Sequence, residues 1–294
     1  MNPINFCKFH GFGNDYIVFE ANDLSEVSSV ENFAVRVCHR HTGIGGDGIA
    51  VLRKSETAEA DYRCEIVNPN GSRAGFSGNG TRCAVAYLYY KNFWTAETLR
   101  LATASGVKSY QFLEREGNAF WFRAELGKPK FGLPNSAHDE AAAYAGENNL
   151  TLDKFSSLVL PRENFVAKFV YVDVGNPVAC LFVKDFAELD WRRVGRNIES
   201  YVKIFPEKTN VVFAKVLDEK NVEIRIWERG AGETASSGTC SIAAAVASAF
   251  TDQTERAISV RAPGGTTETV WRESDDEMLI TGRADLVFRG QLFW

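Results

Sequence analysis

The 294-residue sequence lacks the features that mark several large classes of protein. Its 33 Lys and Arg residues are outnumbered by 38 Asp and Glu, and the net charge of -5 gives no electrostatic footprint for nucleic acid or an anionic membrane. The longest apolar stretch, Cys240 to Phe250, is too short to span a membrane. The start of the chain shows no basic segment followed by an apolar core, so no secretory signal is predicted. We therefore expect a cytoplasmic protein without nucleic-acid or membrane partners.

Cysteine pairs at metal-binding or redox spacing are also absent. In a chain of this size without a secretory signal, scattered cysteines predict reduced and mostly buried thiols. The segment "CHRH" at 38–41 has no second ligand pair at finger-like spacing, so no metal site is expected. The six cysteines are Cys7, Cys38, Cys64, Cys83, Cys180 and Cys240.

The glycine-rich segment "GIGGDG" at 43–48 fits the dinucleotide-binding pattern GxGxxG letter for letter. In that motif, however, the glycines follow a strand and open a helix. Here the preceding "CHRHT" is polar and the following "IAVL" is typical of a strand. We predict a tight turn lining a cleft and no nicotinamide or flavin cofactor.

The sequence repeats itself at an interval of about 160 residues. The stretch "FGNDYIVF" resembles "VGNPVACLF", "IVNPNGSRAGFSGNGTRCAVA" resembles "IWERGAGETASSGTCSIAAAVA", and "LRLATASGVKSYQF" resembles "ISVRAPGGTTETVW". These matches align Asn14 with Asn176, Asn68 with Glu228, and Ser77 with Ser237. Because the matches keep the same order, they predict a duplicated domain with a boundary near 127–135.

Short runs rich in Val, Ile, Phe and Tyr predict a mostly β fold, and Thr81 to Lys91 and Cys240 to Phe250 predict one helix in each half. Both predicted helices are apolar nearly all round, which suits a helix enclosed by a sheet. The fold class is therefore α/β (α+β): two pseudosymmetric domains, each a curved β-sheet wrapped around a central hydrophobic helix. We expect the halves to span 1–128 and 129–282, with 283–294 packing back on the first. The predicted strands are "YIVFE", "GIAVL", "YRCEIV", "LRLAT", "NAFWFRAEL", "FVYVDV", "NVVFAKV" and "VEIRIWE".

The two predicted helix starts, "SGNG" and "SGTC", occupy equivalent positions in the repeat. A helix start offers unpaired backbone N–H groups and a partial positive charge that hold a carboxylate. Two such starts on either side of one small anion suit removal of a proton from one face of a carbon and its return from the other. Taken singly, a serine before a helix is typical of an ordinary cap, so capping stays the alternative interpretation for Ser77 and Ser237.

Six segments of the chain occur in the order found in the diaminopimelate epimerase family: "FHGFGNDYIVF", "HTGIGGDGI", "NPNGSRAGFSGNGTRC", "GNPVACLFV", "TNVVFA" and "ERGAGETASSGT". The chain resembles this family over nearly its whole length. The resemblance implies two pseudosymmetric domains, a homodimer and a cofactor-independent isomerase that interconverts the LL and meso forms of diaminopimelate. In the family, one cysteine thiolate takes the α-proton and a second cysteine thiol delivers a proton to the opposite face.

The resemblance also assigns residues, matched motif by motif. Both catalytic cysteine positions hold serine here, Ser77 and Ser237, and a histidine often found after "GNP" is Val178. The glycine expected after "GT" is Cys240. The side chains implied to hold the amino acid are Asn14, Asn68, Asn176, Asn210, Glu228 and Arg229, and the backbone donors to its carboxylate are Gly78, Asn79, Gly238 and Thr239.

Serine is a far weaker acid than cysteine, which titrates near 8.5. An alcohol lies roughly five pKa units higher, so ionising it costs on the order of 7 kcal/mol more, equivalent to roughly a 10⁵-fold loss of rate. No histidine flanks either serine, which leaves Glu228 and Asp47 as candidate proton relays. Cys83 and Cys240 lie on the predicted helices, where we expect them to pack.

Three hypotheses follow. The first is a diaminopimelate epimerase-type isomerase acting on diaminopimelate or a related amino acid, with Ser77 and Ser237 in the proton-transfer positions. The second is a catalytically silent protein that binds a small amino acid. The third is an isomerase with another substrate and a carboxylate base such as Glu228.

Overall fold

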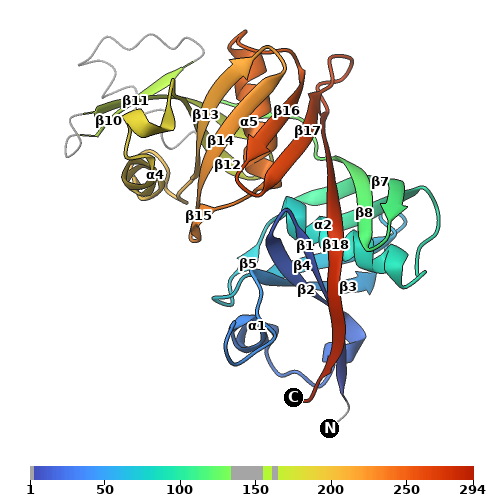
Figure 1. Cartoon of the computed structure of the whole chain (residues 1–294). Coiled ribbons are helices and arrows are strands. Elements are labelled where there is room, and N and C mark those ends of the chain that lie inside the picture. The colour runs from blue at the N-terminus through green and yellow to red at the C-terminus, as the bar shows by residue number, and fades with distance from the viewer. Residues whose placement is uncertain (1–2, 134–154, 161–164) are drawn as a thin grey trace. The chain divides into compact units, whose positions relative to one another are not determined.

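The computed structural model describes residues 3–133, 155–160 and 165–294 (Figure 1). The chain divides into two compact units. The N-terminal unit comprises Met1–Leu126 and Ile280–Trp294, and the C-terminal unit comprises Gly127–Leu279. The end of the chain thus belongs to the same unit as its beginning.

The N-terminal unit is a sheet that closes around one helix. Its helices are η1 (Ala21–Leu24), α1 (Val30–Cys38) and α2 (Gly78–Tyr90). Its strands are β1 (Ile4–Gly11), β2 (Asn14–Glu20), β3 (Gly48–Lys54), β4 (Tyr62–Val67), β5 (Arg73–Ala74), β6 (Thr98–Thr103), β7 (Gly106–Glu116), β8 (Ala119–Glu125) and most of β18 (Met278–Leu292).

Strand pairing runs continuously around this unit. Strands β1 and β2 pair antiparallel, β2 and β3 parallel, β3 and β4 antiparallel, β4 and β6 parallel, and β6, β7 and β8 antiparallel. Strand β18 pairs with both β1 and β8 and so closes the ring. Helix α2 lies inside and contacts β1 to β4 (Figure 1), with every residue from Gly78 to Tyr89 buried. The apolar sequence of α2 follows from this enclosure on all sides.

The C-terminal unit repeats this arrangement. Its helices are η3 (Phe186–Glu188), α4 (Trp191–Glu199) and α5 (Gly238–Phe250). Its strands are β9 (Lys130–Phe131), β10 (Ser156–Leu160), β11 (Phe165–Asp173), β12 (Pro177–Phe182), β13 (Asn210–Asp218), β14 (Asn221–Glu228), β15 (Gly232–Thr234), β16 (Ala257–Ala262) and β17 (Gly265–Trp271).

Five successive strand pairings of the C-terminal unit match those from β1 to β7 in the first unit. Strands β11 and β12 pair antiparallel, β12 and β13 parallel, β13 and β14 antiparallel, β14 and β16 parallel, and β16 and β17 antiparallel. Helix α5 contacts β11 to β14, β16 and β17, and all its residues from Gly238 to Ser248 are buried. The predicted fold of two pseudosymmetric halves, each a sheet around a hydrophobic helix, is confirmed.

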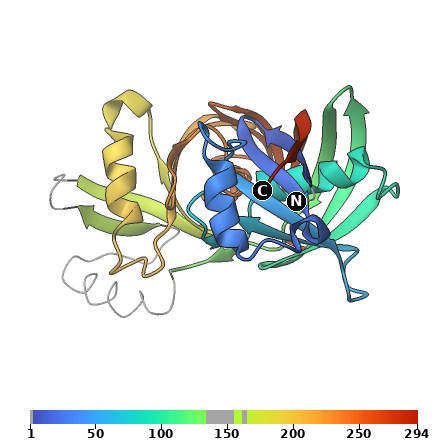
Figure 2. The same ribbon diagram turned by 90° about the horizontal axis from the view of Figure 1, so that it is seen from below.

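The structure adds one outer helix to each unit and lengthens the inner ones. Helices α1 and α4 cover the outside of their own sheets (Figure 2), contacting β3 and β4 in one unit and β13 and β14 in the other. They were not predicted from the sequence. Helices α2 and α5 begin at Gly78 and Gly238 rather than at Thr81 and Cys240, because glycine has a weak helix propensity that hides the first turn in the sequence.

All six cysteines are free thiols in buried positions, as predicted. Within the described ranges 3–133, 155–160 and 165–294, no helix is long and apolar enough to cross a membrane.

Candidate active site

The start of α2 is the candidate site of the N-terminal unit. Ser77 is the N-cap, and its Oγ accepts a hydrogen bond from the backbone N–H of Gly80 at 3.1 Å. The first helical residues, Gly78 and Asn79, are buried. The first N–H groups of a helix have no partner within the helix, and they carry its partial positive charge. This end of α2 therefore suits a small carboxylate.

A chain of amide hydrogen bonds leads away from this helix start. Asn79 Nδ2 donates to Asn14 Oδ1 at 3.3 Å, and Asn14 Nδ2 donates to Asp47 Oδ2 at 2.8 Å. Arg82 Nη1 donates to Asn79 Oδ1 at 3.0 Å. These bonds fix which end of each amide is oxygen and which is nitrogen, so Asn14 and Asn79 are oriented before any ligand arrives.

Arg82 is a buried cation in the second turn of α2. Its side chain is only 1% exposed, and burial lowers the pKa of its guanidinium. Gly282 allows this fit, since a Cβ there would lie 2.9 Å from Arg82 Cζ. The charge adds to the positive potential at the helix start and so favours an anionic ligand.

Two aspartates and two cations stabilise the loop behind Asn14. Lys8 Nζ and Arg40 Nη2 each lie 2.8 Å from a carboxylate oxygen of Asp15, and Arg40 Nη2 lies 2.7 Å from Asp47 Oδ1. Burial opposes ionisation of Asp15, but hydrogen bonds from Arg40 and Lys8 outweigh it and lower its pKa to about 2. The glycine-rich turn before β3 therefore ends in an ion-pair network.

The start of α5 is the candidate site of the C-terminal unit, and Ser237 is the N-cap of this helix. Unlike Ser77, Ser237 accepts no hydrogen bond from the helix backbone; its hydroxyl lies 3.3 Å from Thr239 Oγ1. Burial raises the pKa of Cys240 well above the usual range, and hydrogen bonds with Ser237 and Thr239 only partly oppose this.

The predicted polar residues of this unit form a second network. Arg229 Nη2 donates to Asn176 Oδ1 at 3.1 Å, and the backbone N–H of Arg229 donates to Asn210 Oδ1 at 3.0 Å. Asn210 Nδ2 donates to the carbonyl of Pro177 at 2.9 Å. The structure therefore brings three of the predicted residues into direct contact, from loops that lie far apart in the sequence.

Asn68 and Glu228 take matching places at the ends of β4 and β14. Asn68 is partly buried and its Nδ2 donates to Ser72 Oγ at 2.9 Å. The carboxylate of Glu228 contributes to the raised pKa of Cys240, which places its negative charge near the start of α5. No hydrogen bond joins Asn68 to Asn14 or Asn79 within the described residues.

Within the described residues, neither Asp47 nor Glu228 is a hydrogen-bond partner of the Ser77 or Ser237 hydroxyl. In the described part of the chain, Ser77 Oγ has two partners, the Gly80 N–H and the phenol of Tyr16 at 2.9 Å. Ser237 Oγ shares a hydrogen bond with the hydroxyl of Thr239. Sequence reasoning missed Tyr16. Its signal was alternation, since Asn14 and Tyr16 lie two apart on β2 and face the same side.

Neither Cys83 nor Cys240 takes the place of the missing thiols. Both are fully buried, and burial raises the pKa of each thiol, so both stay protonated at neutral pH. The expectation that they pack in the helices is confirmed.

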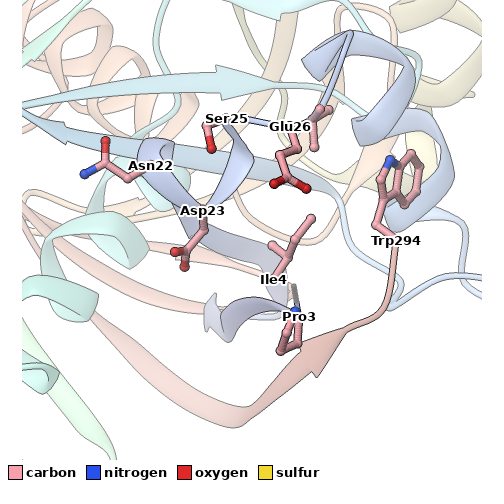
Figure 3. Close-up of a pocket in the computed structure, with 8 residues that line it drawn as sticks. Pro3, Ile4, Asn22, Asp23, Ser25, Glu26 and Trp294 are labelled. Atoms are coloured by element: carbon pink, nitrogen blue, oxygen red, sulfur yellow. The ribbon is translucent and has the colours of Figure 1, made fainter. Parts of the chain in front are cut away.

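A separate pocket of about 190 Å³ lies beside both chain ends (Figure 3), away from the predicted residues. Figure 3 shows the carboxylates of Asp23 and Glu26 and the Trp294 ring around it. Among the residues that the structure describes, no group of three or more His, Cys, Asp and Glu side chains could hold a metal ion.

Comparison with solved structures shows the class of fold. The chain aligns over 99% of its length with 93% of a probable proline racemase from Agrobacterium radiobacter (TM-score 0.71, 13% identity). It also aligns over 100% of both chains with a phenazine biosynthesis protein of the PhzF family from Bacillus anthracis (TM-score 0.68, 18% identity). The protein therefore shares its fold with these two proteins.

Comparison of sequences then shows the family. The profile of the diaminopimelate epimerase family matches residues 6–132 and 170–287. The diaminopimelate epimerase of Moorella thermoacetica is 34% identical over 287 residues, 98% of either chain. That of Caldanaerobacter subterraneus is 34% identical over 292 residues, 98% of this chain and 99% of its own. This chain belongs to the diaminopimelate epimerase family.

Proposed function

We propose that the protein is an isomerase that interconverts LL- and meso-diaminopimelate, or a related amino acid, by proton transfer at Cα. Ser77 and Ser237 stand at the two proton-transfer positions. The observation that carries the proposal is a set of predicted polar side chains that their neighbours hold in fixed orientations: Asn14 and Asn79 beside the start of α2, and Asn176, Asn210 and Arg229 in the C-terminal unit.

The helix starts, the polar side chains and the serines each contribute a distinct part of this chemistry. The helix starts hold the carboxylate next to the reacting carbon, which stabilises the negative charge that develops when the α-proton leaves. Arg229 and the amides bind the polar distal end. Serine is roughly five pKa units less acidic than cysteine, so we expect turnover to be slow unless a neighbouring group exchanges protons with it.

Deuterium incorporation tests the proposal. The protein at high concentration is incubated in D₂O with LL- or meso-diaminopimelate, and Cα exchange is followed by NMR or mass spectrometry. Exchange that stops in the Ser77→Ala variant supports the proposal. No exchange over a day, with these or other amino acids, overturns it.

The second candidate function is amino-acid binding without turnover. It is favoured by Ser237, whose hydroxyl lies against another hydroxyl and a protonated thiol and against no base within the described residues. Calorimetry separates the two, since binding without Cα exchange supports the second. An isomerase that uses Glu228 as its base predicts instead that Glu228→Gln abolishes exchange while Ser77→Ala does not.

The proposal includes a cytoplasmic location, because a set of six free and buried thiols is typical of a reducing compartment. The homodimer implied by the family stays a prediction.

A further inference from the structure

Tyr16 is the side chain that contacts the Ser77 hydroxyl. The phenol oxygen lies 2.9 Å from Ser77 Oγ, within one shared hydrogen bond, although the two residues are 61 positions apart. Tyr16 is 6% exposed, so its ring and hydroxyl are largely shielded from water. A buried phenol needs a hydrogen-bond partner, and here that partner is a group in a catalytic position.

Two glycines hold the Tyr16 ring in this place. A Cβ on Gly48 would lie 2.7 Å from Cε1 of the ring, and a Cβ on Gly80 would lie 2.8 Å from the same atom. Gly48 stands opposite Tyr16 in the parallel pairing of β2 and β3, and Gly80 is the residue whose N–H donates to Ser77 Oγ. The absence of a Cβ at these two positions therefore lets the ring pack close to the backbone of β3 and α2, beside Ser77.

We propose that Tyr16 is a positioning residue that exchanges a proton with Ser77. This inference rests on the proposed function and deepens it. When Ser77 acts as the acid, its Oγ–H bond breaks as the new Cα–H bond forms, and the Tyr16 O–H bond breaks as its proton passes to Oγ. The negative charge moves from the carbanion to the phenolate, and the phenol is restored by a proton from water that reaches it through the 6% of Tyr16 that stays exposed. In the opposite direction the phenolate accepts the Ser77 proton while Oγ takes the proton from Cα.

The acidity of a phenol makes this exchange worthwhile. Tyrosine titrates near 10, whereas an alcohol lies roughly five units above a thiol, so the phenolate is on the order of 10³-fold easier to form than the alkoxide. The Gly80 N–H and the helix start stabilise negative charge at Oγ while the proton is in transit. Ser77 thereby acts together with Tyr16, whose phenol is closer in acidity to a cysteine thiol than an alcohol is.

The first test uses a thiol as the probe and needs no turnover. In a Ser77→Cys background, the pKa of the introduced thiol is read from the pH dependence of its alkylation by iodoacetamide. The six native thiols are buried and give a low background, measured in the unmodified protein. We expect Tyr16→Phe to raise this pKa by about one unit, because the phenol donates to the thiolate.

Tyr110→Phe is the matched control. Tyr110 is 1% exposed and its hydroxyl lies 2.6 Å from Thr81 Oγ1 on the same helix, so it is a buried phenol that does not contact Ser77. We expect no shift of the thiol pKa in this variant. An unchanged pKa with Tyr16→Phe, or an equal rise with Tyr110→Phe, overturns the inference.

The second test uses Cα exchange of diaminopimelate in the otherwise unmodified protein. Tyr16→Phe should lower kcat by at least about 10²-fold, remove one limb of the pH profile and leave calorimetric affinity unchanged. Equal losses in both phenylalanine variants, or a loss in affinity alone, would show a purely structural role. If the unmodified protein exchanges nothing, the proposed function fails while the thiol measurement still decides the Tyr16 inference.

Discussion

The starts of α2 and α5 have the same backbone arrangement in their two units, but the side chains around them differ. In the N-terminal unit, Tyr16 stands opposite Gly48, and Gly80 leaves room for its ring. At the matched places of the C-terminal unit, Val178 stands opposite Asn210, and Cys240 replaces the glycine. The N-terminal unit therefore has a large side chain, Tyr16, beside two glycines, whereas the C-terminal unit has the smaller Val178 beside an asparagine and a cysteine.

This difference gives the two serines different surroundings. Ser77 accepts a backbone N–H and shares a hydrogen bond with a phenol, whereas Ser237 lies against Thr239 and Cys240. Beneath the first turn, Arg82 of α2 corresponds to Ile242 of α5, both fully buried. The duplicated fold therefore keeps a serine N-cap at the helix start in both units, while the hydrogen-bond partners of that serine differ.

The largest effect is expected when both serines are replaced by the cysteines that the family has at these positions. Ser77→Cys combined with Ser237→Cys should raise the Cα exchange rate by up to roughly 10⁵-fold, because each thiol is about five pKa units more acidic than the alcohol it replaces. Deuterium incorporation at Cα of diaminopimelate in D₂O measures this rate. The control is the Ser77→Ala/Ser237→Ala variant, which lacks both a hydroxyl and a thiol at the two positions. Retained binding without any gain would mean that the binding site itself has changed.

A second prediction concerns charge found in one unit only. Asp15 has a folded pKa of about 2, below the unfolded value, so it contributes stability above about pH 4 that is lost as pH falls through 2. Asp15→Asn should lower the free energy of unfolding by about 2.5 kcal/mol at pH 7, and the difference should shrink as the pH approaches 2.

Urea titrations at pH 7, 5 and 3 measure this effect. Pro177 occupies the matched position in the C-terminal unit, and the exposed Glu273→Gln provides a control there with no expected change. A destabilisation by Asp15→Asn that stays constant from pH 7 to pH 3 would contradict the ion-pair explanation.

The third prediction tests the exchange of large and small residues. Gly80→Ala should destabilise the protein by about 1–3 kcal/mol, because the new methyl group meets the Tyr16 ring. In a Tyr16→Val background, which imitates Val178, the same change should cost much less. Thermal unfolding of the four variants gives the coupling energy, and additive effects would show that the ring and the glycine are independent.

The smallest expected effect separates the two caps. Ser77→Ala should cost about 1 kcal/mol, since it removes the bond from the Gly80 N–H, whereas Ser237→Ala should cost only a few tenths. Chemical denaturation of the two single variants measures both. Equal losses would mean that Ser237 also caps its helix in solution.

Much of this fold could be predicted because its signals are local. The short β runs, the two apolar helices and the repeat that aligns Ser77 with Ser237 are patterns within the sequence. Helix α4 could not, since Trp191, Val194 and Ile198 make a sparse apolar face and its stability comes from packing on the sheet. The same holds for α1, where Phe33 packs against Phe19 and Trp294.

The site divides in the same way. Motif matching placed Asn14 and Asn79, which the structure joins by a hydrogen bond, and Arg229 with its two asparagines. Alternation along β2 puts Tyr16 on the same side as Asn14, but its contact with Ser77 could not be predicted, because the position of the ring depends on two glycines from other elements. A candidate relay chosen by charge, Asp47, is already engaged by Asn14 and Arg40.

The route of the chain through β18 bears on how the protein is made. Residues Met1–Leu126 are translated before the C-terminal unit, but the strand that joins β1 to β8 is translated after it. The C-terminal unit is continuous in sequence and can fold before β18 is made. Until then, β1 and β8 of the N-terminal unit are edge strands with one unpaired side, which can pair with other chains. A stop codon just before β18 would therefore damage the N-terminal unit, although most of that unit is encoded ahead of the C-terminal unit.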